Sequence, residues 1–372
     1  MLFEYKMIQS LPFRFVRFFV EASLVALAIQ IFMVSGNGCS DRPEDFQHLR
    51  YSLGIAFVLA FGLTYLENKK PIIATTIHLS VLWFIRYYLA YVLIGYGTAK
   101  LIDLQFHGNL ANLDQKVGDL SAMNLLWVFF GASYPYSFFV GIAQIIASIM
   151  LFNRRTSTFA AVLMFSILAN IVMVNFAYNV CVKLFSSIYL LMNCYILSYD
   201  FPRFWTFFFG KTAVPAQSNR SFWPNNISPK IIFGFNTLLA ILMVAQQSNR
   251  ILGYIQSPER QKPLTYGAWE IERVQVGSFV DNIQPDPVRW RRMFFEEGNQ
   301  VSINSETGFV AGFNAKYNAD NQMVELQSKE DTNQIWSGKY VFDASQDKMI
   351  FLGLNGSDSI KINLKRISRY KR

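Results

Sequence analysis

The sequence predicts a membrane-embedded bundle of helices followed by a β-rich domain. Hydrophobic residues make up 52% of the chain and charged residues only 16%, whereas about a quarter of the residues in a soluble protein are charged. The apolar residues are concentrated between about residues 11 and 247, and short alternating runs replace the long apolar ones after about residue 250. The expected fold class is a membrane all-α helical bundle of about seven transmembrane helices, followed by a C-terminal antiparallel β-barrel or sandwich.

These two patterns divide the chain into a membrane domain at residues 1–250 and a soluble β-rich domain at residues 258–372. The net charge is +8 in residues 1–257 and +1 in residues 258–372, which together give the +9 of the whole chain. The cations of the first part lie in short loops beside apolar runs. This placement is typical of the positive-inside rule and indicates a lipid bilayer rather than a nucleic acid as the partner.

The membrane domain contains several apolar runs of the length that a helix needs to cross a bilayer, roughly 20 residues. Candidate spans lie at residues 12–34, 50–66, 71–101, 134–152, 157–177, 180–198 and 230–248. The third is long for one crossing, so it either tilts or begins at the interface. Residues 121–133 are apolar but short, and we expect an interfacial or re-entrant segment there. The first span lacks a small-x-small cleavage pattern, so we interpret it as an uncleaved helix rather than a secretory signal.

The charges of the loops predict an orientation. Loops on the N-terminal side hold eleven cations, and the opposite loops hold five that are mixed with acidic residues. The eleven are Lys6, Arg14, Arg17, Lys69, Lys70, Arg154, Arg155, Arg203, Lys211, Arg220 and Lys230. This asymmetry favours a cytoplasmic N-terminus in a multi-pass protein of the cytoplasmic (inner) membrane. Seven crossings then place the C-terminal domain in the periplasm or outside the cell, and one crossing more or fewer reverses that.

The three cysteines, Cys39, Cys181 and Cys194, have no spacing that is typical of a metal site or a redox pair. The sequence therefore predicts no disulfide framework. It contains no haem-ligand pair, iron–sulfur cysteine set, phosphate loop or nucleophile triad. The cofactor remains unknown, and a redox cofactor would have to bind noncovalently or belong to a partner.

The C-terminal part reads as eight strands separated by turn signals such as SETG, NADN and NGSD. The strands are expected at residues 268–276, 289–297, 300–305, 308–317, 322–328, 334–342, 348–354 and 359–367. A small barrel of this kind either holds a ligand or fills with its own side chains, and we favour a filled core. Arg289, Arg291 and Arg292 beside Trp290 indicate either a basic docking patch or an exposed strand face.

Ionisable residues inside the predicted spans are functional candidates, because burying them in a bilayer is costly. Glu21 lies in the first span, His78 and Arg86 in the third, and Lys183 at the start of the sixth. One interpretation is a structural Glu21–Arg86 pair. Another is a polar pocket in which Arg86 and Lys183 hold an anion or a quinone carbonyl. Lys183 near a helix end is also compatible with snorkelling to the interface.

Two stretches of the membrane domain resemble the DoxX family of small membrane proteins. The first is RYYLAYVLIGYGTAKL at residues 86–101, which resembles the opening helix of the family. The second runs from GASYPYSFFVGIAQIIASIMLFNRRTSTFAAV to NIVMVNFAYNVCVKLFSSIYLLM at residues 131–192 and resembles its later helices. The family core would cover about residues 71–200, so the chain looks like a long form with extra helices and a C-terminal β domain.

The resemblance implies a link to thiosulfate:quinone oxidation and to membrane oxidoreductase complexes, although many members have no known role. The positions that it implies for ligand binding are Arg86, Lys100, Asn175, Tyr178, Asn179 and Lys183. The chain departs from the expected pattern at three positions, where Gln144 replaces Glu, Asn179 replaces Asp and Cys181 replaces Pro. Losing two carboxylates removes possible proton carriers and weakens an enzymatic role.

Two main hypotheses about function follow, and a channel or transporter is a weaker third, because the sequence shows only scattered polar groups rather than a continuous polar path. In the first, the chain is a non-catalytic accessory or scaffold subunit that presents an extracytoplasmic β domain to a protein partner. In the alternative, it is a subunit of a membrane oxidoreductase complex that binds quinone or a small anion through Arg86 and Lys183. The lost carboxylates and the lack of cofactor motifs favour the first.

Overall fold

A computed structural model describes the chain at residues 11–34, 39, 41–106, 108–210, 227–257, 260–277, 279–281, 290–305, 308–318, 322–331, 335–343, 347–355 and 358–368. Lys6, Lys211, Arg220 and Arg289, which entered the charge interpretations above, lie outside these residues. The chain forms two compact units. One contains the long helices, and the other contains the strands together with residues 106–134.

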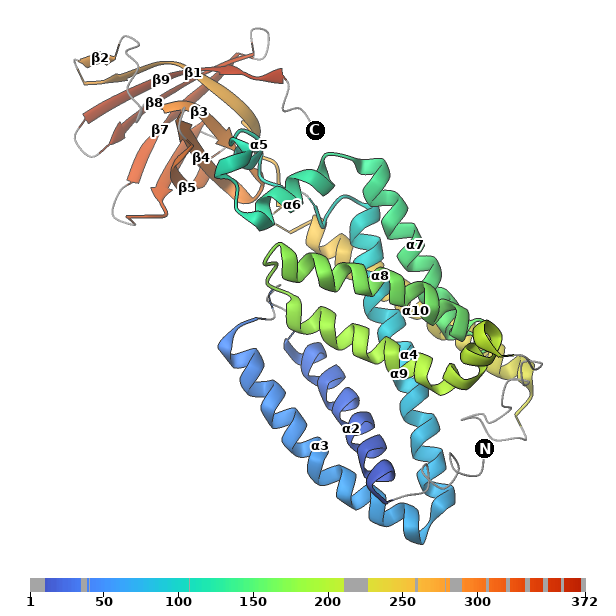
Figure 1. Ribbon diagram of the computed structural model, residues 1–372. Helices are drawn as coiled ribbons and strands as arrows, with labels where there is room; N and C mark the ends of the chain where they lie inside the picture. The colour runs from blue at the N-terminus through green and yellow to red at the C-terminus, as the bar shows by residue number, and fades with distance from the viewer. Residues whose placement is uncertain are drawn as a thin grey trace. The chain divides into compact units, whose positions relative to one another are not determined.

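The helical unit begins with three long helices, α2 (Leu11–Val34), α3 (Pro43–Lys69) and α4 (Pro71–Leu101). Helices α2 and α3 lie side by side as an antiparallel pair (Figure 1). Only Lys70 separates α3 from α4, and Pro71 starts α4 because a proline is tolerated in the first turn, where its missing N–H has no partner in any case. The predicted third span thus forms one helix of 31 residues.

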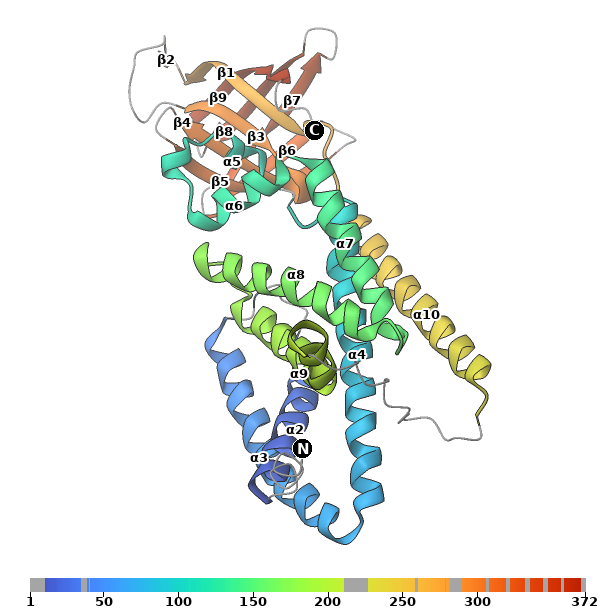
Figure 2. The same ribbon diagram turned by 45° about the vertical axis from the view of Figure 1, so that its right-hand side comes forward.

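Four more long helices follow, α7 (Tyr134–Phe152), α8 (Ser157–Ala177), α9 (Lys183–Phe209) and α10 (Pro229–Ile255). Helices α8 and α9 form a second antiparallel pair (Figure 2). Among the described residues, six helices are long and apolar enough to cross a bilayer, namely α2, α3, α4, α7, α8 and α10. The chain is therefore a multi-pass membrane protein. Helix α9 is long enough but more polar, since Asp200 and Arg203 lie in its second half.

Helices α4 and α7 pack closely because each has a glycine at their contact. A Cβ atom on Gly97 would lie 3.0 Å from the carbonyl oxygen of Gly141, and one on Gly141 would lie 2.8 Å from that of Gly97. Small residues of this kind let membrane helices approach backbone to backbone. The contact aligns the C-terminal half of α4, which carries Lys100, with the middle of α7.

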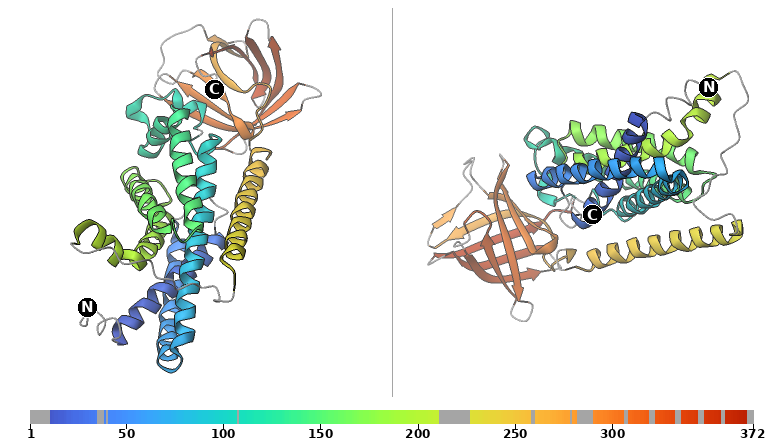
Figure 3. Two further views of the ribbon diagram at one scale, coloured as in Figure 1. Left: turned by 90° about the vertical axis from the view of Figure 1, so that its right-hand side faces the viewer. Right: turned by 90° about the horizontal axis from the view of Figure 1, so that it is seen from below.

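The second unit is a closed antiparallel barrel (Figure 3). Its strands are β1 (Gly267–Val276), β3 (Trp290–Phe295), β4 (Gln300–Ser305), β5 (Phe309–Asn318), β6 (Met323–Ser328), β7 (Ile335–Asp343), β8 (Lys348–Asn355) and β9 (Asp358–Arg366). Consecutive strands are neighbours, and β1 pairs with β9 to close the barrel. A short strand β2 (Phe279–Asp281) folds back on β1. The predicted bundle followed by a β-barrel is confirmed, and each of the eight predicted strands has its counterpart.

Large apolar side chains fill the barrel. Trp269, Phe313, Trp336 and Phe351 are each at most 2% exposed and belong to one hydrophobic cluster. On β7, β8 and β9 the buried residues alternate with exposed ones, as the period of a strand requires. The predicted filled core is what the described residues show.

Residues 106–134, which connect α4 to α7, belong to the same unit as the barrel, and the part around α5 packs on it. This segment contains α5 (Leu110–Leu113), the 3-10 turn η2 (Val117–Asp119) and α6 (Ala122–Gly131). Leu110 is 1% exposed and packs on Phe294 and Ala268 of the barrel. The Ala111 N–H donates to Glu296 Oε1 at 3.0 Å, and Asn304 Nδ2 donates to the Ala111 carbonyl at 3.1 Å. The connection between the membrane helices α4 and α7 is therefore part of the same unit as the strands.

Arg292 does not form a free docking patch, because it pairs with Asp114 of the same connection and its side chain is 11% exposed. Both interpretations of the arginines beside Trp290, a docking patch and an exposed strand face, are therefore wrong for Arg292. The ion pair adds to the attachment of α5, since both of its members are largely removed from water.

Candidate functional site

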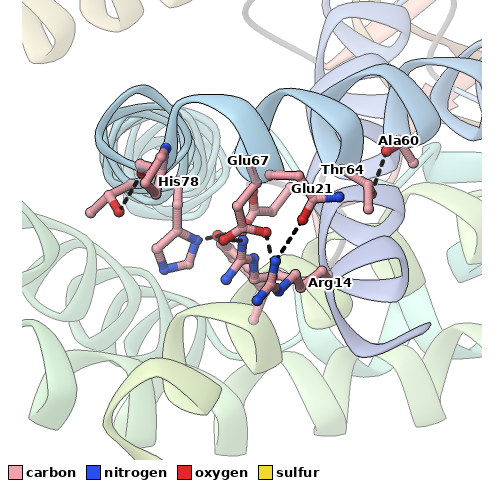
Figure 4. Close-up of polar contacts among 11 residues, drawn as sticks. Arg14, Glu21, Ala60, Thr64, Glu67 and His78 are labelled. Carbon is pink, nitrogen blue, oxygen red and sulfur yellow. Dashed lines mark hydrogen bonds and ion pairs between the residues drawn. The ribbon is translucent and has the colours of Figure 1, made fainter. Parts of the chain in front are cut away.

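Glu21 is the centre of a polar cluster inside the helical unit (Figure 4). Its side chain on α2 is 1% exposed. Its Oε1 atom contacts Nδ1 of His78 on α4 and accepts a hydrogen bond from the Tyr195 hydroxyl on α9 at 3.2 Å. Its Oε2 atom is buried and has no hydrogen-bond partner among the described residues. One carboxyl group thus joins three helices and keeps one oxygen unused.

A row of charged residues runs along one face of α2, from the start of the helix to Glu21. Arg14, Arg17 and Glu21 are spaced three and four residues apart, so they share one face of α2. Arg17 donates to Glu67 Oε1 at 2.8 Å, and Arg14 donates to Asn68 Oδ1 at 2.8 Å. Figure 4 shows Arg14, Glu67, Glu21 and His78 gathered together. Polar groups therefore line the route from the helix end to the buried carboxyl.

The expected Glu21–Arg86 pair is wrong. Arg86 on α4 is 9% exposed and donates to the Leu151 carbonyl at 2.6 and 3.1 Å and to the Phe152 carbonyl at 3.3 Å. These carbonyls end α7 and have no partner within that helix, so a cation there satisfies them and complements the helix dipole. Arg86 thus fastens α4 to the end of α7.

Lys100 is a buried cation that has no carboxylate partner among the described residues. It is 4% exposed, and its Nζ atom donates to Gln144 Oε1 on α7 at 3.0 Å. Gln144 is fully buried, and its Nε2 atom has no partner among the described residues. Tyr96, one turn before Lys100 on α4, lies against Tyr189 of α9. The site is rich in hydrogen-bond donors, which is the chemistry that an anion or a carbonyl group needs.

The other predicted residues meet where α8 turns into α9. Asn175 donates to the Ser186 hydroxyl at 3.0 Å, and Tyr178 is half-buried at the end of α8. Asn179 is exposed and has φ of 52°, a left-handed conformation that asparagine adopts more readily than most residues. Lys183 pairs with Asp41 at 3.0 Å instead of snorkelling. These residues therefore form the turn between α8 and α9 and attach it to Asp41.

The prediction of no disulfide is wrong, because Cys39 and Cys181 are bonded to each other. They are separated by 142 residues and hold the α2–α3 connection to the α8–α9 connection. Asp41 strengthens the same junction, since its two oxygens accept from Lys183 Nζ and from the Leu184 N–H at 3.0 and 3.1 Å. Cys194 is a free thiol on α9.

The structure does not bring Arg86 and Lys183 together. Arg86 contacts the carbonyls that come just before α8, whereas Lys183 comes just after α8. The 21 residues of α8 have a length of about 30 Å, so the two cations are associated with opposite ends of one helix. A single pocket that uses both is therefore not formed.

The chemistry open to these clusters is proton and hydrogen-bond chemistry. No group of three or more His, Cys, Asp and Glu residues that could hold a metal ion occurs in the part of the chain that the structure describes. Glu21, His78 and Tyr195 combine a carboxyl, an imidazole and a phenol, which are groups that bind and pass protons.

The barrel offers a different kind of surface. Met323, Lys339, Leu352, Lys361 and Gln275 are cross-strand neighbours in one row over β6, β7, β8, β9 and β1. Together with Leu354 they line a shallow groove of about 500 Å³. Leu352 is 43% exposed and Leu354 is 52% exposed. We call these six residues the outer β face.

Glu296 makes the attachment of α5 depend on pH. Burial raises the pKa of Glu296 above its ordinary value, although the N–H groups of Ala111 and Leu110 oppose the shift. A carboxyl with a raised pKa contributes stability that is present below its usual pKa and is lost as the pH rises through the raised value. We expect α5 to be held more firmly in acid than at neutral pH.

The check is hydrogen exchange at Leu110 and Ala111, corrected for the intrinsic exchange rate, in the native protein and in Glu296→Gln. The amide keeps a carbonyl acceptor but cannot ionise, so protection in this variant is expected to be independent of pH. The matched control is Glu330→Gln, which alters an exposed carboxylate and should retain the native pH dependence. Equal pH dependence in Glu296→Gln would contradict this account.

Comparisons with known proteins show one curated relative and no family. The uncharacterized protein YwoB of Bacillus subtilis (strain 168) is 29% identical over 137 residues, which cover 37% of this chain and 88% of the relative. No family model matches the chain. No solved structure matches it. The resemblance to DoxX therefore stays a prediction.

Proposed function

We propose that the chain is a non-catalytic accessory or scaffold component of the membrane, whose helices anchor a β-barrel that recognises a protein partner. The observation that carries the proposal is the closed and filled barrel. Because Trp269, Phe313, Trp336 and Phe351 occupy its interior, a ligand of any size has to bind outside. Helix α5 is bound to the barrel through the Ala111 N–H and Glu296, and it lies in the connection between the membrane helices α4 and α7.

The outer β face supports recognition of a segment that carries carboxylates and apolar side chains. Leu352 and Leu354 supply exposed apolar surface. Lys339 and Lys361 flank Leu352 on the neighbouring strands, and neither has an ion-pair partner within the described ranges. Lys348 and Lys365, which are cross-strand partners, add two more cations to the same sheet. An acidic partner would complement this charge.

The disulfide supports a cytoplasmic N-terminus. If α2, α3, α4, α7 and α8 each cross the bilayer, Cys39 and Cys181 emerge on the same side, opposite the N-terminus. Disulfides form and persist in oxidising compartments, so this side faces away from the cytoplasm. The described cations Lys69, Lys70 and Arg154 lie in connections on the other side, as the positive-inside rule expects.

The attachment of α5 supports an extracytoplasmic barrel. By the same count of crossings, the connection between α4 and α7 emerges on the side of the disulfide. This connection contains α5, which binds the barrel through Ala111 and through the Asp114–Arg292 pair. The barrel then lies on that side too. Because α10 is long and apolar enough to cross the bilayer, α9 has to cross it as well. Seven crossings satisfy this requirement, and six do not.

Reversing the charge of the outer β face tests the proposal. We expect the full-length protein, isolated with a stoichiometric partner from its own membranes, to lose that partner in the double variant Lys339→Glu/Lys361→Glu. Like-charge repulsion in place of attraction should weaken binding at least about tenfold. The measurement is the affinity of the two purified proteins, and replacing the partner's facing carboxylates by lysine should restore it.

The matched control is Lys329→Glu, which reverses an exposed lysine that follows β6 and bonds to Gln300 of β4, outside the outer β face. Binding by this variant should equal that of the native protein. If the double variant binds the partner as tightly as the control does, the outer β face is not the docking surface.

A further inference from the structure

The polar cluster in the helical unit points to an activity beyond anchoring and recognition. Glu21 lies ten residues after the start of α2, about 15 Å along the helix axis. His78 lies seven residues after the start of α4, about 10 Å along that helix. Both groups are therefore inside membrane-spanning segments. Ionisable side chains at such depth are costly and commonly mark proton pathways.

We propose that Glu21 and His78 form an intramembrane proton-exchange site, in which Glu21 stores a proton and His78 passes it to and from the side on which α2 begins. The transfer moves one proton from Nδ1 of the imidazolium to Oε1 of the carboxylate. The N–H bond breaks and the O–H bond forms, so an ion pair becomes two neutral groups and the total charge is unchanged. A proton from water on the α2 side then binds to the imidazole.

The contacts of Glu21 are those of a group that changes its proton content. A purely structural buried ion pair needs further hydrogen bonds to satisfy the remaining oxygen. Glu21 meets this requirement at Oε1, through Tyr195 and His78, but not at Oε2. Oε2 is therefore an open acceptor position beside the shared proton.

The surroundings supply a route and a nearly balanced charge. On α2 the facing groups are Arg14 and Arg17, on α3 the facing carboxylate is Glu67, and on α9 they are Tyr195 and Tyr199. Two arginines balance the carboxylates of Glu67 and Glu21, so the cluster is neutral when His78 carries no charge. The His78 side chain is 22% exposed, whereas the Glu21 side chain is 1% exposed. The imidazole is therefore the member of the pair that reaches outward.

No such route continues past Glu21 along α2. The buried residues that follow on α2 are Ser23, which carries no charge, and then Leu24, Leu27, Ala28 and Ile31, which belong to the hydrophobic core. Gln30 beyond them bonds to the Asp45 carbonyl and to Ser52. The site is consequently open toward one side, and this arrangement suits storage and return of a proton rather than free leakage across the bilayer.

Infrared difference spectroscopy on the full-length protein in lipid nanodiscs tests the proposal. A step from about pH 8 to about pH 5 covers the range in which histidine chemistry operates. We expect a carboxylic acid C=O band that appears with the step in the native protein and is absent in Glu21→Gln. The matched control is Glu44→Gln, which alters an exposed carboxylate in the first turn of α3, outside the polar cluster, and should retain the band. A band that persists unchanged in Glu21→Gln would overturn the assignment.

A second variant tests the relay without altering Glu21. His78→Asn places an amide near the position of Nδ1 but cannot carry a proton. The Glu21 band should still appear in this variant, but its rise after the pH step should be slower by about a hundredfold or more, the size of a general acid–base contribution. Native kinetics in His78→Asn would show that protons reach Glu21 by another path. Native mobility of the Cys39–Cys181 disulfide form on a gel verifies that each variant has folded.

Discussion

Trp269→Ala is expected to destabilise the barrel by about 3–5 kcal/mol while the helical unit keeps its stability. Trp269 is fully buried, and its Nε1 atom donates to the Thr265 carbonyl at 2.8 Å. Arg366 lies 4.8 Å above its ring. Truncating a buried tryptophan costs about 3–5 kcal/mol, and domains of this size are stable by only about 5–15 kcal/mol.

Limited proteolysis followed by mass spectrometry measures this effect on the full-length protein. Cleavage sites within residues 267–366 should become accessible in Trp269→Ala, at concentrations of protease that leave the native barrel intact. Trp269→Phe keeps much of the ring and should be intermediate. Leu354→Ala changes a side chain that is 52% exposed, so it should resemble the native protein. Equal protection of all four proteins would mean that Trp269 does not hold the core together.

The strands were predictable because their signal is local. Alternation of apolar and polar residues identifies β5 to β9 from the sequence, and turn residues mark their ends. The closure of the barrel was not predictable in this way. It depends on the pairing of β1 with β9, in which Gln275 faces Lys361, and residues this far apart in sequence carry no local signal of their pairing. Strand β2 has three residues, too few to show a period.

The candidate site was predictable only in part, for the same reason. The sequence identifies Glu21, His78 and Arg86 as ionisable groups within apolar runs. It does not identify their partners, because these depend on the rotation and contacts of whole helices. The acceptors of Arg86 are the backbone carbonyls of Leu151 and Phe152, and no residue type signals a backbone acceptor. The interpretation that paired Glu21 with Arg86 joined a carboxylate to a guanidinium. It did not consider His78, which is the residue that contacts Glu21.

Residues near the ends of helices illustrate a second limit. Asn179 matches a position where the resemblance implies a ligand, yet its left-handed backbone gives it a role in the turn after α8. Ala111 has no chemical signature at all, yet its N–H and carbonyl groups bind Glu296 and Asn304 across a long stretch of sequence. Backbone groups thus connect residues 106–134 to the strands of the barrel, and the amino-acid composition gives no sign of such contacts.

Removing the disulfide should have the largest effect on the helical unit. Cys39→Ser and Cys181→Ser each open a loop of 142 residues. Closing a loop of that length stabilises a soluble chain by up to about 5 kcal/mol through chain entropy. Helices that remain inserted in the bilayer already restrict the unfolded chain, so a loss of about 2–4 kcal/mol is expected. The Asp41–Lys183 pair should keep part of the junction in place. Thermal unfolding in detergent measures the loss, and Cys194→Ser is the control.

The same variants determine which side of the membrane the junction faces. In intact cells, a maleimide that cannot cross membranes should label Cys181 in Cys39→Ser and Cys39 in Cys181→Ser, but should label neither in the native protein before reduction. Cys194 lies within α9 and provides the background, measured in a Cys39→Ser/Cys181→Ser variant. Labelling that requires permeabilised cells would place the junction in the cytoplasm. The barrel would then move with it, because α5 emerges from the bilayer on the same side and is bound to Glu296.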